Sequence, residues 1–456
     1  MNRDTQLYHL QIIRWTNEFG TVPGIANLYP RLGLGSTWFN LISLFYIPAF
    51  KHQNFTFLNT TLSIWFILWL VERWNYFTYQ KKRLPNSHIF SLLFFLLISY
   101  FVFDWQLLRD TANSTSYDFI ITALSIFSIF FLLSQCFSKA KKPFSFLFIL
   151  LSISVVSFKL SGLSILFLAF IYLLNYQQVI VWLKSFLAGC FILLPVLIKN
   201  HITTGYPVYP LAVSINSPEW QVPGEITLKF KNYILNANKF YNHQLTFIEA
   251  FDQGKGIKTF NWIPFWFKGI LIRHKILFLF AALSLLLLIY TPLVIPRRKK
   301  FRLLLGSIWI IAITWFFSAP DPRFGFGFLL IMAFLPISVF FAKYFSPRLY
   351  TPSAYLSGLA ILIYLYAKTS DIRQNTSLLL HTASIGSPLY TKIVRNGVSF
   401  YEVWPINDST DKRCYFTPLP CLPEMNPYVI PRSNKLKDGF KMTITPDSSF
   451  IRNYNY

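Results

Sequence analysis

Few residues of this chain carry a charge suited to catalysis, so each acidic residue beside an apolar run is informative. The 456 residues include 18 acidic and 42 basic ones. Asp4 lies near the start of the chain, and Asp118 lies at the start of the apolar run 117–137. A carboxylate at such a boundary has a raised pKa and can act as a general base. The alternatives are a first-turn acid stabilised by the helix dipole for Asp118, and a solvated loop residue for Asp4.

Two basic residues are candidates for binding a phosphate. Lys159 lies between two apolar runs and could hold a phosphate as a point charge. Alternatively, its ammonium group extends to the membrane–water boundary. Arg323 follows a rigid Pro-Asp-Pro turn, where an arginine beside a helix N-terminus forms an anion site. The alternative is a structural pair with Asp321, which is worth little if it is exposed.

A polar segment after the apolar run 178–199 suits a substrate groove. Its glycine and prolines favour an extended exit from the helix, and its aromatic rings offer faces for sugars. A structural turn motif is the alternative. Together with a histidine near Asp4, the candidates for the substrate groove are His9, Asn200, His201, Thr204, Tyr206, Tyr209 and Trp220.

Several other kinds of chemistry find no support in the sequence. The seven histidines are scattered, and the chain has no His-x-x-His or Cys-x-x-Cys motif. The ligand spacing therefore does not support a divalent metal, and we expect no cofactor. There is no Walker loop or Rossmann fingerprint for a nucleotide.

The composition identifies the elements that must position these residues. Hydrophobic residues make up 54% of the chain and charged residues 13%, with a mean hydropathy of +0.43. A soluble domain carries about 25% charged residues, so a soluble enzyme, a disordered chain and a coiled coil are excluded. The apolar runs are continuous, unlike the alternating strands of an outer-membrane barrel. We therefore expect an all-α polytopic membrane protein in contact with a lipid bilayer.

The positive charge fits the same interpretation. The formal charge of +24 comes largely from short basic clusters between apolar runs, which are typical of cytoplasmic loops. Nucleic acid is not an expected partner, because no basic domain lies outside the membrane part.

Ten apolar runs approach the roughly 20 residues that a span needs. The runs 143–157 and 160–175 are short and predict a tight hairpin. If the basic clusters face the cytoplasm, the segments that carry the candidate residues all lie outside. The predicted runs are 58–79, 87–103, 117–137, 143–157, 160–175, 178–199, 274–295, 302–318, 324–343 and 352–367.

This topology divides the chain into five parts. External loop 1, residues 1–57, includes an interfacial helix within Thr37–Phe50. Transmembrane helices follow over 58–199, then a large external loop over 200–273, further transmembrane helices over 274–367, and an external C-terminal region over 368–456. An external start without a signal peptide leads us to expect that an upstream first helix is missing from this chain.

The cysteines agree with these sides of the membrane. Cys414 and Cys421 lie in the external C-terminal region, and their spacing suits a small disulfide loop in an oxidising compartment. Two unpaired thiols are the alternative. Cys136 and Cys190 lie in predicted spans, where we expect inert apolar residues.

Several segments resemble bacterial multi-pass proteins related to the C-type (GT-C) glycosyltransferases. The segments Asp4-Thr-Gln-Leu-Tyr-His-Leu-Gln and Val22-Pro-Gly-Ile-Ala-Asn-Leu-Tyr-Pro resemble the first external loop of that group. The Thr204-Gly-Tyr-Pro-Val-Tyr-Pro and Asp321-Pro-Arg-Phe segments resemble further blocks, and the Cys414–Cys421 tail also fits.

The resemblance implies a GT-C-like bundle of about ten transmembrane helices in the bacterial inner (plasma) membrane. It implies that Asp4 is the catalytic aspartate of the first external loop, with Asp118 as the second acidic position. It also implies a polyprenyl-phosphate-linked sugar as donor and a glycan or lipid as acceptor. On their charge, Lys159 and Arg323 are candidates to stabilise the leaving phosphate.

Three functions therefore remain open. The leading hypothesis is a glycosyltransferase with a lipid-phosphate donor. The second is a polymerase or ligase of surface polysaccharide, which would use His201 and Arg323. The third is a transporter, a flippase or an inactive paralogue. Transporters place charges at the bilayer midplane and often show internal repeats, whereas here the closest charges are Glu72 and Arg73 and no repeat is evident.

Overall fold

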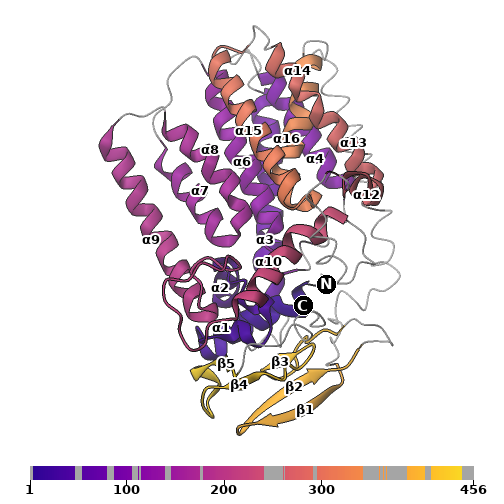
Figure 1. The fold of residues 1–456 in the computed structure, drawn as a ribbon. Helices are drawn as coiled ribbons and strands as arrows, with labels where there is room; N and C mark the ends of the chain where they lie inside the picture. The colour runs from indigo at the N-terminus through magenta and orange to yellow at the C-terminus, as the bar shows by residue number, and fades with distance from the viewer. Residues whose placement is uncertain are drawn as a thin grey trace.

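The computed structural model shows a helical bundle with short helices and two small sheets at one end (Figure 1). It describes residues 4–46, 54–79, 87–104, 111, 114–138, 145–174, 178–240, 260, 262–290, 295–342, 359, 363, 366, 388–405 and 412–443.

The bundle is built from long apolar helices. Within the described ranges, five segments are long and apolar enough to cross a membrane: α6, α9, α13 with α14, α15 and α16. Three shorter apolar helices, α4, α7 and α8, accompany them. The protein is therefore a membrane protein. The helices of the bundle are α3 (Phe57–Tyr79), α4 (Ser87–Phe103), α6 (Asp118–Phe137), α7 (Phe146–Phe158), α8 (Leu163–Leu173), α9 (Val179–Thr204), α13 (Ile272–Ala282), α14 (Ser284–Ile289), α15 (Arg298–Ser318) and α16 (Pro322–Phe341).

Every predicted apolar run before residue 343 coincides with a described helix or helix pair. The hairpin over 143–175 is present as α7 and α8, joined by a short turn at Leu160–Gly162. The tenth run, 352–367, lies outside the described residues apart from isolated positions. The GT-C-like arrangement of ten spans therefore stays a prediction.

Helices α16 and α9 occupy opposite environments. Helix α16 is the centre of the bundle and packs on α4, α6 and α13, so most of its side chains are buried. Helix α9 packs chiefly on α7, and only 11% of its most apolar stretch is buried. A long apolar helix with so little protein cover needs lipid around it.

Short helices of the N-terminal region form a layer at one end of the bundle. Residue Ser36 caps α2 by accepting a hydrogen bond from the backbone N–H of Trp38. Phe39 and Ile42 of α2 are buried where this helix packs on α1 and α7. The predicted helix is thus present over its first part, and its contact with lipid stays a prediction. The elements of this layer are η1 (Thr5–His9), α1 (Leu10–Phe19), η2 (Ile25–Asn27), η3 (Pro30–Gly33), α2 (Thr37–Leu44) and η5 (Asn54–Thr56).

The segment 200–273, which we expected to be a loop, contains two helices, α10 (Gly224–Phe240) and α12 (Trp262–Gly269). Ile226 and Phe230 of α10 are buried against Tyr206 and Tyr209. This small cluster holds α10 beside the end of α9.

The C-terminal region adds strands that the sequence did not predict, so only the membrane part is all-α. Strands β1 and β2 form an antiparallel hairpin, and its turn at Asn396-Gly397 has positive φ at both residues, which favours the twist of a hairpin. Strand β3 pairs in parallel with β2, and β4 pairs with β5. The strands are β1 (Tyr390–Arg395), β2 (Val398–Val403), β3 (Cys421–Leu422), β4 (Val429–Pro431) and β5 (Phe440–Met442), with the 3-10 turn η7 (Leu436–Asp438) between the last two.

This C-terminal region docks on the N-terminal layer. The backbone N–H of Phe440 donates to the carbonyl of Pro23 at 3.0 Å, and the Phe440 ring contacts Trp15. Gly24 has a positive φ, and a Cβ atom there would collide with the Phe440 carbonyl, so the two regions meet backbone to backbone. Residues 4–46 and 412–443 thus lie at the same end of the bundle (Figure 1). Which side of the membrane that end faces stays a prediction.

Candidate functional site

One cavity of about 2270 Å³ lies where the N-terminal layer meets the ends of the bundle helices. Its walls come from both the membrane helices and the covering regions, including α10 and the C-terminal region. All four residues that we predicted to do chemistry line it: Asp4, Asp118, Lys159 and Arg323.

Asp4 lies between two guanidinium groups. Its Oδ1 atom is 3.6 Å from Nη1 of Arg31, and its Oδ2 atom is 3.7 Å from Nη1 of Arg323. Both distances exceed the 2.7–3.2 Å of a direct N–H···O hydrogen bond. The carboxylate is therefore paired by charge with both arginines.

The electrostatics correct one expectation for Asp4. Burial alone would raise the pKa of its carboxyl, but the positive charges of Arg31 and Arg323 outweigh burial and lower that pKa below its ordinary value. Asp4 is thus ionised at neutral pH. Burial lowers the pKa of His9 to about 4, so its ring is neutral, and its Nδ1 atom lies 3.2 Å from the hydroxyl of Thr115.

Arg323 is fixed by the first turn of α16. Asp321 caps this helix by accepting from the Arg323 backbone N–H at 3.0 Å, and it also accepts from the Arg323 Nε at 2.8 Å. The structural pair with Asp321 therefore exists, and the remaining face of the guanidinium reaches Asp4. The side chain of Arg323 is still 41% exposed, so an anion in the cavity can reach it.

Lys159 points at Asp118. Its ammonium group donates to Oδ1 of Asp118 at 2.7 Å, and each side chain is about one-fifth exposed. The same ammonium lies 3.4 Å from the ring centroid of Phe324, a favourable cation–π position. Burial lowers the pKa of Lys159, against the opposing effect of Asp118. Asp118 is also the first-turn acid of α6, so the two interpretations of this residue are compatible.

Arg31 is a functional candidate that the sequence analysis missed. Its Nη2 atom donates to the hydroxyl of Tyr233 on α10 at 3.3 Å, and its guanidinium lies over the rings of Tyr8 and Tyr233. The carboxylate of Asp4 and the surrounding tyrosines raise its pKa against the effect of burial. The available signal was its isolation, since Arg31 is the single charge within residues 25–34.

The comparisons with known proteins assign a family. Residues 1–330 match the model of a family described as Domain of unknown function (DUF8201). The chain belongs to this family. No curated protein and no solved structure matches the chain. The DUF8201 match includes all the ion pairs around Asp4 and Asp118. The cavity residues Lys412 and Glu424, from the C-terminal region, lie beyond it.

The groove candidates of this DUF8201 chain divide into two groups. His9, Asn200 and Tyr209 line the cavity. The other four candidates do not line the cavity: His201, Thr204, Tyr206 and Trp220. Their contacts are those of a structural turn, which was the alternative interpretation of this segment.

The residues of the second group form hydrogen bonds that involve the backbone, or pack against a side chain of the C-terminal region. The Thr204 hydroxyl donates to the Asn200 carbonyl at 2.7 Å, and the Tyr206 hydroxyl donates to the Val222 carbonyl at 2.8 Å. The carbonyl of His201 accepts from the N–H of Gly205, and Arg432 lies over the Trp220 ring. These contacts fix the exit from α9.

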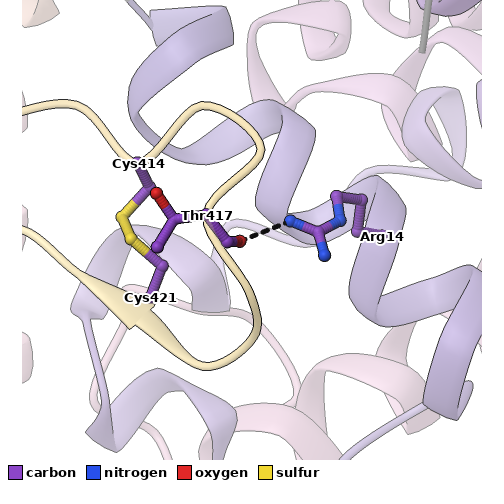
Figure 2. The surroundings of a disulfide bond; sticks show 4 residues. All are labelled: Arg14, Cys414, Thr417 and Cys421. Atoms are coloured by element: carbon purple, nitrogen blue, oxygen red, sulfur yellow. Dashed lines mark hydrogen bonds between the residues drawn. A yellow bond between two sulfur atoms is a disulfide. The ribbon is translucent and has the colours of Figure 1, made fainter. Parts of the chain in front are cut away.

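Two further predictions concern cysteines and metals. Cys414 and Cys421 form the predicted disulfide. Figure 2 shows Arg14 of α1 donating a hydrogen bond to the Thr417 carbonyl, which lies in the loop closed by this disulfide.

Among the residues that the structure describes, no group of three or more His, Cys, Asp or Glu side chains could hold a metal ion. Cys136 is buried and Cys190 is exposed on α9.

Proposed function

We propose that this DUF8201 protein is a GT-C-type membrane glycosyltransferase of the bacterial inner membrane. It transfers a sugar from a polyprenyl-phosphate-linked donor to a glycan or lipid acceptor on the extracytoplasmic side. The observation that supports this proposal most is the meeting of Asp4, Asp118, Lys159 and Arg323 in one cavity. These four residues come from four distant segments of the chain. They form two ion pairs, Asp4 with Arg323 and Asp118 with Lys159, and both pairs line the same cavity.

The walls of the cavity suit a lipid-linked phosphate. At the charged end, Arg323 and Lys159 offer cations to a phosphate group. Another part of the wall is apolar, with Leu193 and Leu197 from α9 and Ile311 from α15. A donor with an isoprenoid chain and an anionic head needs both kinds of surface. Such a donor also explains why the sequence contains no nucleotide-binding motif.

The proposed reaction breaks the bond between the sugar C1 and the phosphate oxygen and forms a bond between C1 and the acceptor oxygen. Asp4 accepts the proton of the acceptor hydroxyl, and the lipid phosphate leaves with the bonding electron pair. Lys159 and Arg323 stabilise the charge that develops on the phosphate. Because the pKa of Asp4 is low, the carboxylate is ready as a base but accepts the proton only as the new bond forms.

The test is transfer of a radiolabelled sugar from a polyprenyl-phosphate donor by membranes that contain the protein. Asp4→Asn should lower transfer by about 10²- to 10⁴-fold, the usual contribution of a general base. Glu18→Gln is the matched control, because Glu18 is exposed, pairs only with Arg14 among the ion pairs of the described residues, and does not line the cavity. Transfer by Asp4→Asn within about threefold of wild type would contradict the assignment.

A polymerase or ligase would instead depend on Arg323 and His201. His201 does not line the cavity, so the geometry favours the transferase. The same assay separates the two, because a polymerase or ligase should tolerate Asp4→Asn and lose activity in Arg323→Gln.

A further inference from the structure

A second polar cluster, which the proposed chemistry does not use, lines the same cavity. Asp104 lies just after α4, and Arg273 and His274 lie in the first turn of α13. The Nη1 atom of Arg273 is 3.3 Å from Oδ1 of Asp104, and the Tyr100 hydroxyl donates to Oδ2 of Asp104 at 3.3 Å. The carboxylate of Asp104 is therefore held in place by two partners.

His274 is incompletely satisfied. It is 5% exposed, and its ring packs edge-on against Phe326 at 5.5 Å. Its Nδ1 atom has no hydrogen-bond partner within the described part of the chain. Buried polar atoms in native proteins almost always have a partner, either a protein group or an ordered water, so an unsatisfied nitrogen in a cavity wall is consistent with a polar ligand there.

Arg273 and two aromatic rings complete this part of the wall. The side chain of Arg273 is 43% exposed, and its guanidinium has five N–H groups, more than its contact with Asp104 uses. Trp315 and Phe326 also line the cavity. The indole N–H of Trp315 already donates to the Asp321 carbonyl at 3.0 Å, so its ring offers the cavity an apolar surface.

We propose that Asp104, Arg273 and His274 form a carbohydrate subsite that binds the hydroxyl groups of the acceptor, with Trp315 and Phe326 packing against the sugar ring. A sugar hydroxyl both donates and accepts hydrogen bonds, and this cluster offers a carboxylate acceptor, guanidinium donors and an imidazole. Asp104 offsets the positive charge of Arg273 at 3.3 Å, so the cluster is close to neutral and suits an uncharged sugar better than an anion. The role as acceptor subsite rests on the proposed transferase function, whereas sugar binding can be measured without turnover.

The test is saturation-transfer difference NMR with the full chain in lipid nanodiscs, free of glycoside detergents. The probes are maltotriose, cellotriose and chitotriose. We expect at least one trisaccharide to give saturation transfer with wild type. The signal should fall at least fivefold in Arg273→Gln and stay unchanged in the matched control Lys275→Gln, because Lys275 does not line the cavity.

A second variant guards against misfolding, since Arg273→Gln leaves Asp104 without its cation. His274→Phe keeps the ring packing on Phe326 and removes both nitrogens, and it should also lower the signal at least fivefold with an unchanged unfolding temperature. The subsite is refuted if no trisaccharide gives a signal with wild type, or if both variants keep the wild-type signal.

Inorganic diphosphate distinguishes this subsite from the proposed donor end. It should leave the trisaccharide signal in place, because we assign the phosphate to Arg323 and Lys159. Displacement of the sugar by diphosphate would show an anion site and overturn the carbohydrate assignment. Sugar binding that persists in a protein without transferase activity would refute the proposed function and leave the subsite intact.

Discussion

The Oδ2 atom of Asp4 lies 3.7 Å from the Nη1 atom of Arg323, which joins the start of the described chain to the first turn of α16. The other carboxylate oxygen faces Arg31 at 3.6 Å. One carboxylate thus ties three distant segments together at the cavity.

Arg31 should set the pH dependence of activity. Its positive charge helps to keep the pKa of Asp4 below its ordinary value, so Arg31→Gln should raise that pKa. The acid limb of the pH–rate profile, where Asp4 becomes protonated, should therefore move to higher pH. Rates of sugar transfer between pH 3 and pH 8 measure this shift. Lys392→Gln, at an exposed position of β1, serves as the control, and an unmoved acid limb in Arg31→Gln would exclude the effect.

His9 should make the protein less stable in mild acid. The unfolded chain binds a proton at His9 near pH 6.5, whereas the folded protein resists it until about pH 4. As the pH falls through this window, the unfolded state takes up more protons and the free energy of unfolding decreases, by about 3 kcal/mol over the whole window.

Asp4 affects stability at a lower pH than His9, so the contributions of the two residues to the free energy of unfolding can be measured separately. Its lowered pKa contributes stability that is complete above pH 3.8 and is lost only as the pH falls further. Unfolding temperatures at pH 7.5 and pH 5 test the role of His9. His9→Phe should show a smaller difference between the two pH values than wild type, and an equal difference would rule out this role.

Asp118 and Lys159 should be coupled. Removing one partner of this half-buried pair leaves an uncompensated charge in the cavity wall and costs roughly 1–3 kcal/mol, so Lys159→Met should destabilise the protein. Asp118→Leu combined with Lys159→Met removes both charges and should recover much of the loss. A double-mutant cycle of unfolding free energies measures the coupling. Strictly additive effects of the two substitutions would show that the 2.7 Å contact carries no energy.

The Cys414–Cys421 loop should hold the segment that carries Asp4. The backbone N–H of Tyr415 donates to the Gln6 carbonyl at 3.2 Å, and Arg413 donates to the Gln6 side chain. Arg14 donates to the Thr417 carbonyl at 2.6 Å. Opening this short loop removes a chain constraint worth about 2–3 kcal/mol, so the loop should loosen on Gln6.

Hydrogen exchange measures that loosening. Amide exchange over residues 4–14 should be faster in Cys414→Ser/Cys421→Ser than in wild type. Cys136→Ser/Cys190→Ser, which changes the two free cysteines, is the matched control and should exchange like wild type. Equal protection of residues 4–14 in all three proteins would mean that the loop does not support Asp4.

The sequence predicts the membrane helices well, because continuous apolar runs such as those of α6 and α16 leave no other stable arrangement in a bilayer. It misses the strands, because segments of two to six residues, such as β3 and β1, are too short for a periodic pattern. It also misses α10. The polar sequence of this helix is typical of a loop, and the helix is held in place by a tertiary contact between Phe230 and Tyr209.

The site could be predicted in part. A charge beside an apolar run identifies Asp4, Asp118, Lys159 and Arg323. This pattern shows which residues are unusual, but it does not show which of them form ion pairs. The pairing of Asp118 with Lys159 and of Arg31 with Asp4 arises from tertiary contacts. For the same reason, nothing in the sequence separates Tyr209, which lines the cavity, from Tyr206, which bonds to the Val222 backbone.

The most direct test of the account is a cryo-electron-microscopy structure of the protein in nanodiscs that contain polyprenyl phosphate. We expect the phosphate in the cavity, within hydrogen-bonding distance of Arg323 and Lys159, with the isoprenoid chain along α9. A lipid phosphate bound elsewhere, with Asp4 and Arg323 facing an empty cavity, would contradict it.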